Sequence, residues 1–288
     1  MTTPDPAAWE PSDRELERRA VRRRMALRSR LIATLAVGAF LAVTLGAILA
    51  SPGWPRVQET FFSWEHARDS FGEIWKGFWR YNVVIFLIAE PLILVLGLGL
   101  AVARQARSPW LTPVRGLAVV YTDLFRGVPT LLLVMLFGFG MPALQLQGVP
   151  NSGLFWAIVA LVVSYAAYVA EVFRAGIESI HPSQLASADA LGLSRGQAMR
   201  HVVVPQAVRR VIPPLLNDFV SLQKDTALVF VVGVLDAVWA AQDYGNYHFN
   251  YTPLVVVAVF FVVLTIPLAR LTDWLQRRMA ERERAGQR

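Results

Sequence analysis

Hydrophobic residues in this chain fall in long, mostly apolar blocks rather than at the three- and four-residue spacing of an amphipathic helix. About 20 consecutive apolar residues are enough for a helix to cross the hydrocarbon core of a membrane. Six blocks approach or exceed this length, and each is predicted to be a membrane span: residues 31–50, 81–103, 116–141, 154–173, 212–239 and 253–269. The pattern therefore predicts an all-α integral membrane protein, a helical bundle of about six transmembrane helices.

Charged residues support this prediction and add an orientation. They make up 17% of the 288 residues, whereas about a quarter of a soluble domain is charged. Lys and Arg close to span ends are retained in the cytoplasm. Arginines are concentrated in four segments, with eight in residues 14–30, three in 104–115, five in 174–210 and six in 270–288. With six spans these segments all fall on one side, so we expect a multi-pass protein with both termini in the cytoplasm.

The same pattern divides the chain into parts. Residues 1–30 are a basic cytoplasmic N-terminal arm, 31–50 the first transmembrane helix, 51–80 an external loop, 81–270 the core domain and 271–288 a cytoplasmic C-terminal tail. The arm is interpreted as a topology signal that attracts anionic membrane lipid, not as a nucleic acid site. The external loop contains tryptophans that suit the lipid headgroup zone.

A polar, basic insert between the fourth and fifth spans carries the local signals of two short helices. Pro182 suits the first turn of a helix, residues 183–191 are good helix formers, and Gly192 is placed to end that helix in a left-handed conformation. Ser194 and Gln197 form a capping-box pair, which predicts the start of a second helix.

Prolines are expected to bound the second helix. Pro205 should end it, and the proline pair at residues 213–214 should mark the entry to the fifth span. We call residues 183–205 the hook. Leu191 and Leu193 project from it, so it is interpreted as a docking surface for a partner outside the membrane. The alternative is that it packs on the chain's own spans.

Small and apolar residues precede the glycine of the hook, and a Val-Val-Val-Pro run follows it up to Pro205. This arrangement resembles the coupling loop of permease subunits of ATP-binding-cassette (ABC) importers, whose consensus begins Glu-Ala-Ala, contains a glycine and ends Ile-x-Leu-Pro. The first part is matched by Ala188, Ala190, Leu191 and Gly192. Ala186 and Ser187 stand where the consensus has Glu and Ala, which removes one possible ionic contact but keeps the spacing from glycine to proline.

Further motifs follow in order along the core: Leu-Phe-Arg-Gly-Val-Pro at residues 124–129, Tyr-Val-Ala-Glu-Val-Phe-Arg-Ala-Gly-Ile at 168–177, Pro-Gln-Ala at 205–207, and the run from Asn217 through Lys224 with Thr226 and Leu228. Together they resemble the polar amino acid branch of these permeases, the histidine/glutamine/glutamate type. The likeness covers about residues 75–280 and leaves residues 1–70 outside it.

The resemblance implies the type I ABC importer permease fold in a bacterial cytoplasmic membrane, with residues 178–210 as the coupling loop of the core permease domain. It implies four kinds of partner: a dimer of ABC ATPase subunits, a second permease subunit in a homodimer or heterodimer, an extracytoplasmic solute-binding protein, and a polar amino acid substrate. One alternative is a permease for another small solute, such as an opine or a sulfur amino acid. Another is a proton-coupled secondary transporter that uses Glu90 or Glu171 as a relay, although no inverted repeat is visible.

Residues for covalent or metal chemistry are missing from the sequence. No segment has the GxxxxGK[ST] pattern of a phosphate-binding loop, so ATP and Mg are expected on a separate ATPase subunit. The chain has no cysteine, and its four histidines are scattered without metal-ligand spacing. We therefore expect a transport subunit rather than an enzyme, with no catalytic residue, metal site or cofactor in this chain.

Ionisable residues at membrane depth are costly and usually face the bundle interior or a water-filled path. In this chain they are Glu90, Asp123, Arg126, Glu171, Asp218, Lys224, Asp225 and Asp236. Structural pairs are the expected role for most of them, with Asp123 paired to Arg126, and Lys224 paired to Asp225 or Asp218.

Glu171 is the favoured substrate contact. Tyr168 lies one helical turn before it and Ser164 two turns, so one helix face carries a carboxylate, a phenol and a hydroxyl. This face suits the ammonium group of an amino acid, and Arg126 has the geometry to bind the carboxylate. The alternative is that Glu171 pairs only structurally, with Arg174 or another cation. The candidates for the substrate path are Glu171, Arg126, Tyr168, Ser164, Asp123 and Lys224.

Overall fold

The computed structural model describes residues 12–106 and 108–285, and every regular element within these ranges is helical. The chain divides into two compact units, Met1–Glu59 and Thr60–Arg288. The first unit contains α1 (Asp13–Leu49) and most of α2 (Trp54–Phe61). Because α1 begins well before the predicted first span, the described part of the basic arm is helical and continuous with that span.

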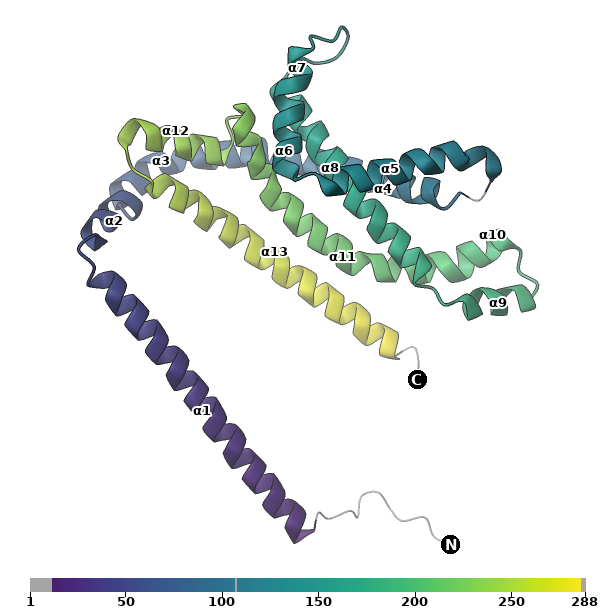
Figure 1. Cartoon of the computed structure of the whole chain (residues 1–288), viewed down its shortest axis with the longest axis horizontal. Coiled ribbons are helices and arrows are strands. Elements are labelled where there is room, and N and C mark those ends of the chain that lie inside the picture. Colours follow the sequence, from purple (N-terminus) through teal and green to yellow (C-terminus); the bar gives the residue numbers. More distant parts are fainter. Residues whose placement is uncertain (1–11, 107, 286–288) are drawn as a thin grey trace. The chain divides into compact units, whose positions relative to one another are not determined.

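The second unit contains the remaining helices (Figure 1). In chain order they are α3 (Trp64–Gly77), η2 (Phe78–Val83), α4 (Val84–Arg104), η3 (Pro109–Leu111), α5 (Thr112–Gly127), α6 (Thr130–Met135), η4 (Leu136–Gly140), α7 (Met141–Ala143), α8 (Gly153–Glu178), α9 (Pro182–Ala190), α10 (Arg195–Ala198), η5 (Met199–Val203), α11 (Val204–Asp225), η6 (Thr226–Val232), α12 (Ala237–His248) and α13 (Thr252–Ala285). The predicted external loop is therefore helical over most of its length.

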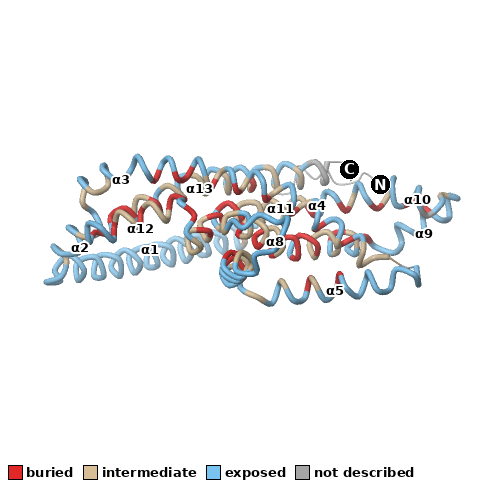
Figure 2. Tube along the Cα trace, turned by 90° about the horizontal axis from the view of Figure 1, so that it is seen from above, coloured by how far each residue is buried: buried red, intermediate tan, exposed pale blue. Residues whose placement is uncertain are grey.

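Helix α8 is the centre of the second unit, and α4, α5, α6 and α11 all pack against it. Buried residues follow α8 along its length (Figure 2), and many of them are alanine. Glycines bring the neighbouring helices close: a Cβ at Gly97 of α4 would lie 2.5 Å from Cγ1 of Val169, and one at Gly176 would overlap Val211 of α11. Small residues at helix contacts are a common basis of association in membranes, because they let backbones approach.

Two of the predicted spans, residues 116–141 and 212–239, are bent. Among the described residues, four helices are long and apolar enough to cross a membrane, and six spans result if each of two bent pairs counts as one. The first pair bends by 104° where α5 meets α6. Val128 is extended there because Pro129 follows it, and an α-helical residue before proline is sterically disfavoured.

The second bend, of 47°, separates α11 and η6 from α12. Gly233 ends η6 with φ of 78°, and Asp236 caps α12 by accepting a hydrogen bond from the backbone N–H of Trp239 at 2.8 Å. Hydrophobic residues continue through both bends, so a pattern of hydropathy alone predicts one long span at each place.

Helix α12 is fixed to the start of the membrane core by a buried polar contact. Asn82 of η2 donates from Nδ2 to Oδ2 of Asp236 at 2.9 Å, and its Oδ1 accepts from the backbone N–H of Ala237 at 3.2 Å. Gly77 lies beside it, where a Cβ would approach the backbone carbon of Asp236 to 2.7 Å. We call this contact the α3–α12 junction. It places two segments that are far apart in sequence side by side.

Candidate functional site

The first helix of the hook ends in a complete Schellman motif. Gly192 has φ of 74°, its backbone N–H donates to Asp189 O at 3.0 Å, and the N–H of Leu193 donates to Ala188 O at 3.1 Å. Pro182 occupies the first turn of α9, as predicted. A Cβ at Gly192 would meet nothing within 4 Å, so only the backbone conformation requires glycine there.

The second helix of the hook begins with the predicted capping box. The backbone N–H of Ser194 donates to Oε1 of Gln197 at 2.8 Å, and the N–H of Gln197 donates to Oγ of Ser194 at 3.4 Å. Ala188 is buried inside the hook, whereas Leu191 is 81% exposed at its tip. Leu193 is half-buried, and Ala190 is exposed. Leu191 is therefore the most exposed of the large apolar side chains that the described part of the hook presents.

Pro205 does not end the second helix, which corrects the prediction. α10 continues through the π-helical turn η5 into α11, and Pro205 lies in the first turn of α11, where its missing N–H is tolerated. The proline pair at residues 213–214 lies inside α11 and not at its start. The hook is thus joined to α11 without a break in the helical path. Gln206 adds a contact back to α9, because its Nε2 lies 3.3 Å from Oε1 of Gln184.

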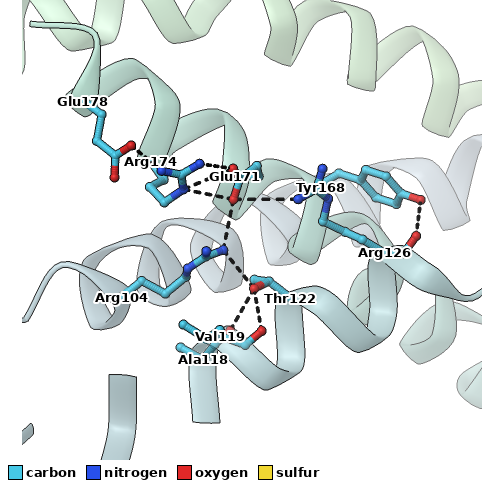
Figure 3. A network of polar contacts seen from close by, with 9 residues as sticks. All are labelled: Arg104, Ala118, Val119, Thr122, Arg126, Tyr168, Glu171, Arg174 and Glu178. Carbon is cyan, nitrogen blue, oxygen red and sulfur yellow. Dashed lines mark hydrogen bonds and ion pairs between the residues drawn. The ribbon is translucent and has the colours of Figure 1, made fainter. Parts of the chain in front are cut away.

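Glu171 of α8 lies in a cluster of three arginines (Figure 3). Its Oε2 is 3.0 Å from Nη1 of Arg104 and 3.8 Å from Nη1 of Arg126, and its Oε1 pairs with Arg174. Arg174 also pairs with Glu178. Three helices, α4, α5 and α8, contribute through these residues and Thr122, which accepts from Nη1 of Arg104 at 2.8 Å. Three guanidinium groups thus share one carboxylate, which leaves net positive charge.

Arg104 was counted above only for orientation, so its position beside Glu171 is new. Arg104 is the last residue of α4, and α4 packs against α8 along most of its length. Its side chain is 15% exposed. From sequence alone, a basic residue at the end of a span can be a topology signal or an ion-pair partner. The packing of α4 on α8 identifies Arg104 as a partner of Glu171.

The other predicted path residues divide into two groups. Tyr168 joins the cluster: its hydroxyl donates to Arg126 O at 3.2 Å, and the Arg126 guanidinium lies 5.8 Å from its ring centroid. Ser164 is fully buried and hydrogen-bonded to Thr130 at 3.1 Å, so its hydroxyl serves the contact between α8 and α6. The face of α8 therefore does not present all three predicted groups to one space.

The expected structural pairs of the remaining charges do not form. Asp123 and Lys224 are both exposed, and neither belongs to an ion pair among the described residues. Arg126 forms an ion pair with Glu171 on α8 instead of with Asp123 on its own helix. Asp225 accepts a hydrogen bond from the hydroxyl of Tyr165 at 2.8 Å instead of pairing with Lys224.

A cleft of about 390 Å³ opens beside the cluster and is called the inner cleft. Charged residues from three helices line it: Arg126, Glu171, Arg210 and Asp218. Oδ2 of Asp218 is buried and has no hydrogen-bond partner among the described residues. Charges of both signs around one cleft can bind a charged or zwitterionic small molecule. In the part of the chain that is described, no group of three His, Asp or Glu residues could hold a metal ion.

The structure combines membrane-length helices and two bent spans with a charged cleft and an exposed hook. These features are those of a membrane transport subunit. Residues 93–281 match the family described as "Binding-protein-dependent transport system inner membrane component", and the chain belongs to this family. It is accordingly a multi-pass inner-membrane protein of a non-enzymatic, permease type, from a family that works with ATPase and binding-protein partners.

Relatives and solved structures agree with this family. The chain is 34% identical over 212 residues to the probable glutamine ABC transporter permease protein GlnM of Bacillus subtilis (strain 168), covering 73% of this chain and 95% of that protein. It is 33% identical to the arginine transport system permease protein ArtQ of the same organism, covering 68% and 87%.

A crystal structure described as an amino acid ABC transporter with histidines superposes with a TM-score of 0.66 at 27% identity, covering 72% of this chain and 94% of that chain. The inward-facing MetNI methionine ABC transporter shares the fold alone, with a TM-score of 0.59 at 19% identity, covering 73% and 97%. The predicted all-α type I importer permease fold is confirmed by these similarities.

Proposed function

We propose that this chain forms the translocation path for polar amino acids in an ATP-driven importer. The relatives named for glutamine and arginine support this substrate class, and they disfavour an opine, sulfur amino acid or proton-coupled alternative. The observation that supports coupling to ATP is the geometry of the hook. The Leu191 side chain is exposed at the tip, and the turn there is held by backbone hydrogen bonds within the hook.

Two ATPase subunits would each receive the hook of one permease subunit, this chain and either a second copy or a sister permease. ATP-driven closure of the ATPases would draw the hooks together. Because the hook continues into α11, this motion would reach Arg210 and Asp218 in the inner cleft. Nucleotide can shift the cleft between inward and outward access only if it binds one global state better than the other.

The inner cleft is the proposed substrate path. Arg126 is 41% exposed and has the fork geometry that suits a carboxylate, and the buried oxygen of Asp218 suits an ammonium group. Glu171 is the counter-ion that holds Arg126 at the cleft, and Tyr168 holds the backbone of Arg126. Ser164, Asp123 and Lys224 do not line the cleft and are left out of this path.

The hook assignment has a direct test, because the chain contains no cysteine. Leu191→Cys provides one reactive thiol at the tip of the hook in the assembled transporter. A bifunctional thiol reagent should cross-link it to an ATPase subunit that carries a single cysteine in its docking groove. Thr130→Cys, on the membrane side of the core, should give no such product. Equal cross-linking of both variants would contradict the assignment.

Orientation is proposed from the arginine distribution, with the hook and both termini in the cytoplasm. A reporter that is active only outside the cytoplasm should be silent when fused after residue 288 and active when inserted within residues 148–151. The reverse result at either position would overturn the orientation.

A further inference from the structure

A second cavity, also of about 390 Å³, lies between α3 and η2 on one wall and α12 on the other. It shares no lining residue with the inner cleft. Both walls come from segments that the proposed orientation places outside the cytoplasm. We call this cavity the outer pocket. An importer receives its substrate on this side, so a cavity here has direct access to substrate that arrives from a binding protein.

Residues of opposite charge line the two walls of the outer pocket. Arg80 of η2 lines one wall, and Asp243 of α12 lines the other. Among the residues that the structure describes, neither forms an ion pair or a side-chain hydrogen bond. Lys76 also lines the pocket, but it pairs with Glu73 at 2.7 Å. The Arg80 guanidinium lies 5.8 Å from the centroid of the Tyr81 ring, a cation–π contact. Within the described residues, the pocket thus offers one guanidinium and one carboxylate without an ion-pair or hydrogen-bond partner.

Aromatic rings occupy the space around these charges. The lining includes Tyr81, Trp239, Tyr244 and Tyr247. Tyr244 is held in place, because its hydroxyl lies 3.1 Å from Nδ1 of His66 and its ring stacks on His248 with centroids 4.0 Å apart. Aromatic rings give apolar contact area at low cost in side-chain entropy, and their polar tips can hydrogen-bond a ligand.

The backbone of the pocket is formed before any ligand arrives. The two walls meet at the α3–α12 junction, where Asn82 and Asp236 are hydrogen-bonded and buried, and where Gly77 leaves no room for a Cβ. A ligand therefore does not have to order a loop, and binding to a preorganised site avoids that free-energy cost.

We propose that the outer pocket binds a free α-amino acid as a zwitterion. The carboxylate would lie against Arg80, the ammonium group against Asp243, and the side chain against the aromatic rings. The pocket would act as an entry site between the binding protein and the inner cleft. The choice of an amino acid as ligand rests on the proposed function.

The test uses the assembled permease–ATPase complex in lipid nanodiscs without its binding protein. Each standard L-amino acid is added in radiolabelled form, and bound label is measured at equilibrium. At least one should bind, and Arg80→Gln and Asp243→Asn should each weaken that binding about tenfold or more, as expected for the loss of one charge-assisted contact. The methyl ester and the N-acetyl derivative of the bound amino acid should fail to compete, because each lacks one of the two charges.

Matched controls lie on α3. Arg68→Gln and Asp69→Asn make the same charge changes on exposed residues that do not line the outer pocket, and binding should be unchanged in both. Binding that is lost in Arg126→Gln but kept in Arg80→Gln would place the amino acid in the inner cleft and overturn the proposal. So would the absence of any binding, or an Arg80→Gln complex that binds amino acid normally but no longer docks the binding protein.

ATP-driven uptake with the binding protein, measured on the same variants, separates the two proposals. Normal amino acid uptake by Arg80→Gln and Asp243→Asn complexes, with unchanged equilibrium binding, would refute the outer pocket and leave the importer function intact. Zwitterion binding that depends on Arg80 in a complex that imports no amino acid would instead support the pocket and refute the importer function.

Discussion

The hook and the α3–α12 junction are both places where helices meet at an angle, but they differ in the sequence separation of the hydrogen bonds that stabilise them. In the hook, the hydrogen bonds of the turn join near neighbours, such as Leu193 N to Ala188 O at 3.1 Å. At the junction, Asn82 and Asp236 bond across 154 positions of sequence. A corner held by local bonds keeps its shape while it moves against the rest of the protein. A corner held by distant residues joins two elements so that they move together.

This difference assigns different mechanical roles to the two regions. The hook can be pushed by a partner and pass the motion to α11, because its turn is held by hydrogen bonds within the hook and its second helix continues into α11. The junction makes α3, η2 and α12 one body around the outer pocket. Substitutions should therefore uncouple transport in the hook without unfolding the protein, and should destabilise the protein at the junction.

The largest effect is expected from Gly192→Val. A β-branched residue resists the left-handed conformation that Gly192 adopts with φ of 74°. The turn should open and ATP-driven uptake should be abolished, while membrane insertion and assembly persist. Gly192→Asn is the matched control, because asparagine enters this conformation most readily among residues with a side chain, and it should retain most uptake. Full uptake and stimulated ATPase activity in purified Gly192→Val complex would show that the hook is not the coupling element.

The junction is tested by two glycines of the same helix. Gly77→Ala places a methyl group 2.7 Å from the backbone of Asp236, which should force α3 and α12 apart at a cost of about 1–3 kcal/mol. Gly72→Ala meets nothing within 4 Å and should be neutral or slightly stabilising, because alanine favours helix. Thermal unfolding of the detergent-purified subunit measures both. Equal midpoints would mean that the junction does not hold α12.

Glu171→Gln tests a third kind of contact, the ion pairs between Glu171 and three arginines. The change removes the carboxylate that three arginines share, so Arg126 should lose its position at the inner cleft. We expect uptake per assembled complex to fall about tenfold, equivalent to about 1.4 kcal/mol. Glu178→Gln is the control, because it removes only the outer partner of Arg174. Normal uptake by correctly assembled Glu171→Gln complex would refute the path assignment.

The smallest effect is expected from Ser194→Ala. The hydroxyl accepts from the N–H of Gln197 at 3.4 Å, and loss of such a cap costs about 1 kcal/mol. Because the Schellman motif of α9 remains, the hook should keep its shape and uptake should fall by less than half. Hydrogen exchange of the amides of Ser194 to Gln197 should nevertheless become faster, and an unchanged exchange rate would mean that the cap contributes nothing.

The same division between local and distant contacts explains how much the sequence predicted. Pro182, Gly192 and Ser194 act on their immediate neighbours, so the start of each helix of the hook and the turn between them were predicted correctly, whereas the end predicted at Pro205 was wrong. The bend at Pro129 also has a local signal, but a hydropathy pattern does not register it. Arg104 beside Glu171 and Asn82 beside Asp236 depend on which helices pack together, and one sequence contains no information on such distant partners.

The prediction for Glu171 illustrates the same point within one site. Helical spacing placed Tyr168 on the same face of α8 as Glu171, and in the structure both residues contact Arg126 of α5. The spacing could not reveal that Ser164 faces Thr130, because that depends on how α8 is rotated in the bundle. Residues that share a helix face by periodicity do not all line the same cleft: Tyr168 and Glu171 line the inner cleft, whereas Ser164 does not.

The central claim is that this chain carries amino acids by coupling its hook to ATP hydrolysis elsewhere. The most direct measurement is amino acid uptake into vesicles that contain the permease and its ATPase, with binding protein outside, ATP inside and an uncoupler to remove any proton gradient. Uptake should depend on ATP, persist with the uncoupler and disappear in Gly192→Val vesicles. Uptake that needs the proton gradient and not ATP would contradict the account.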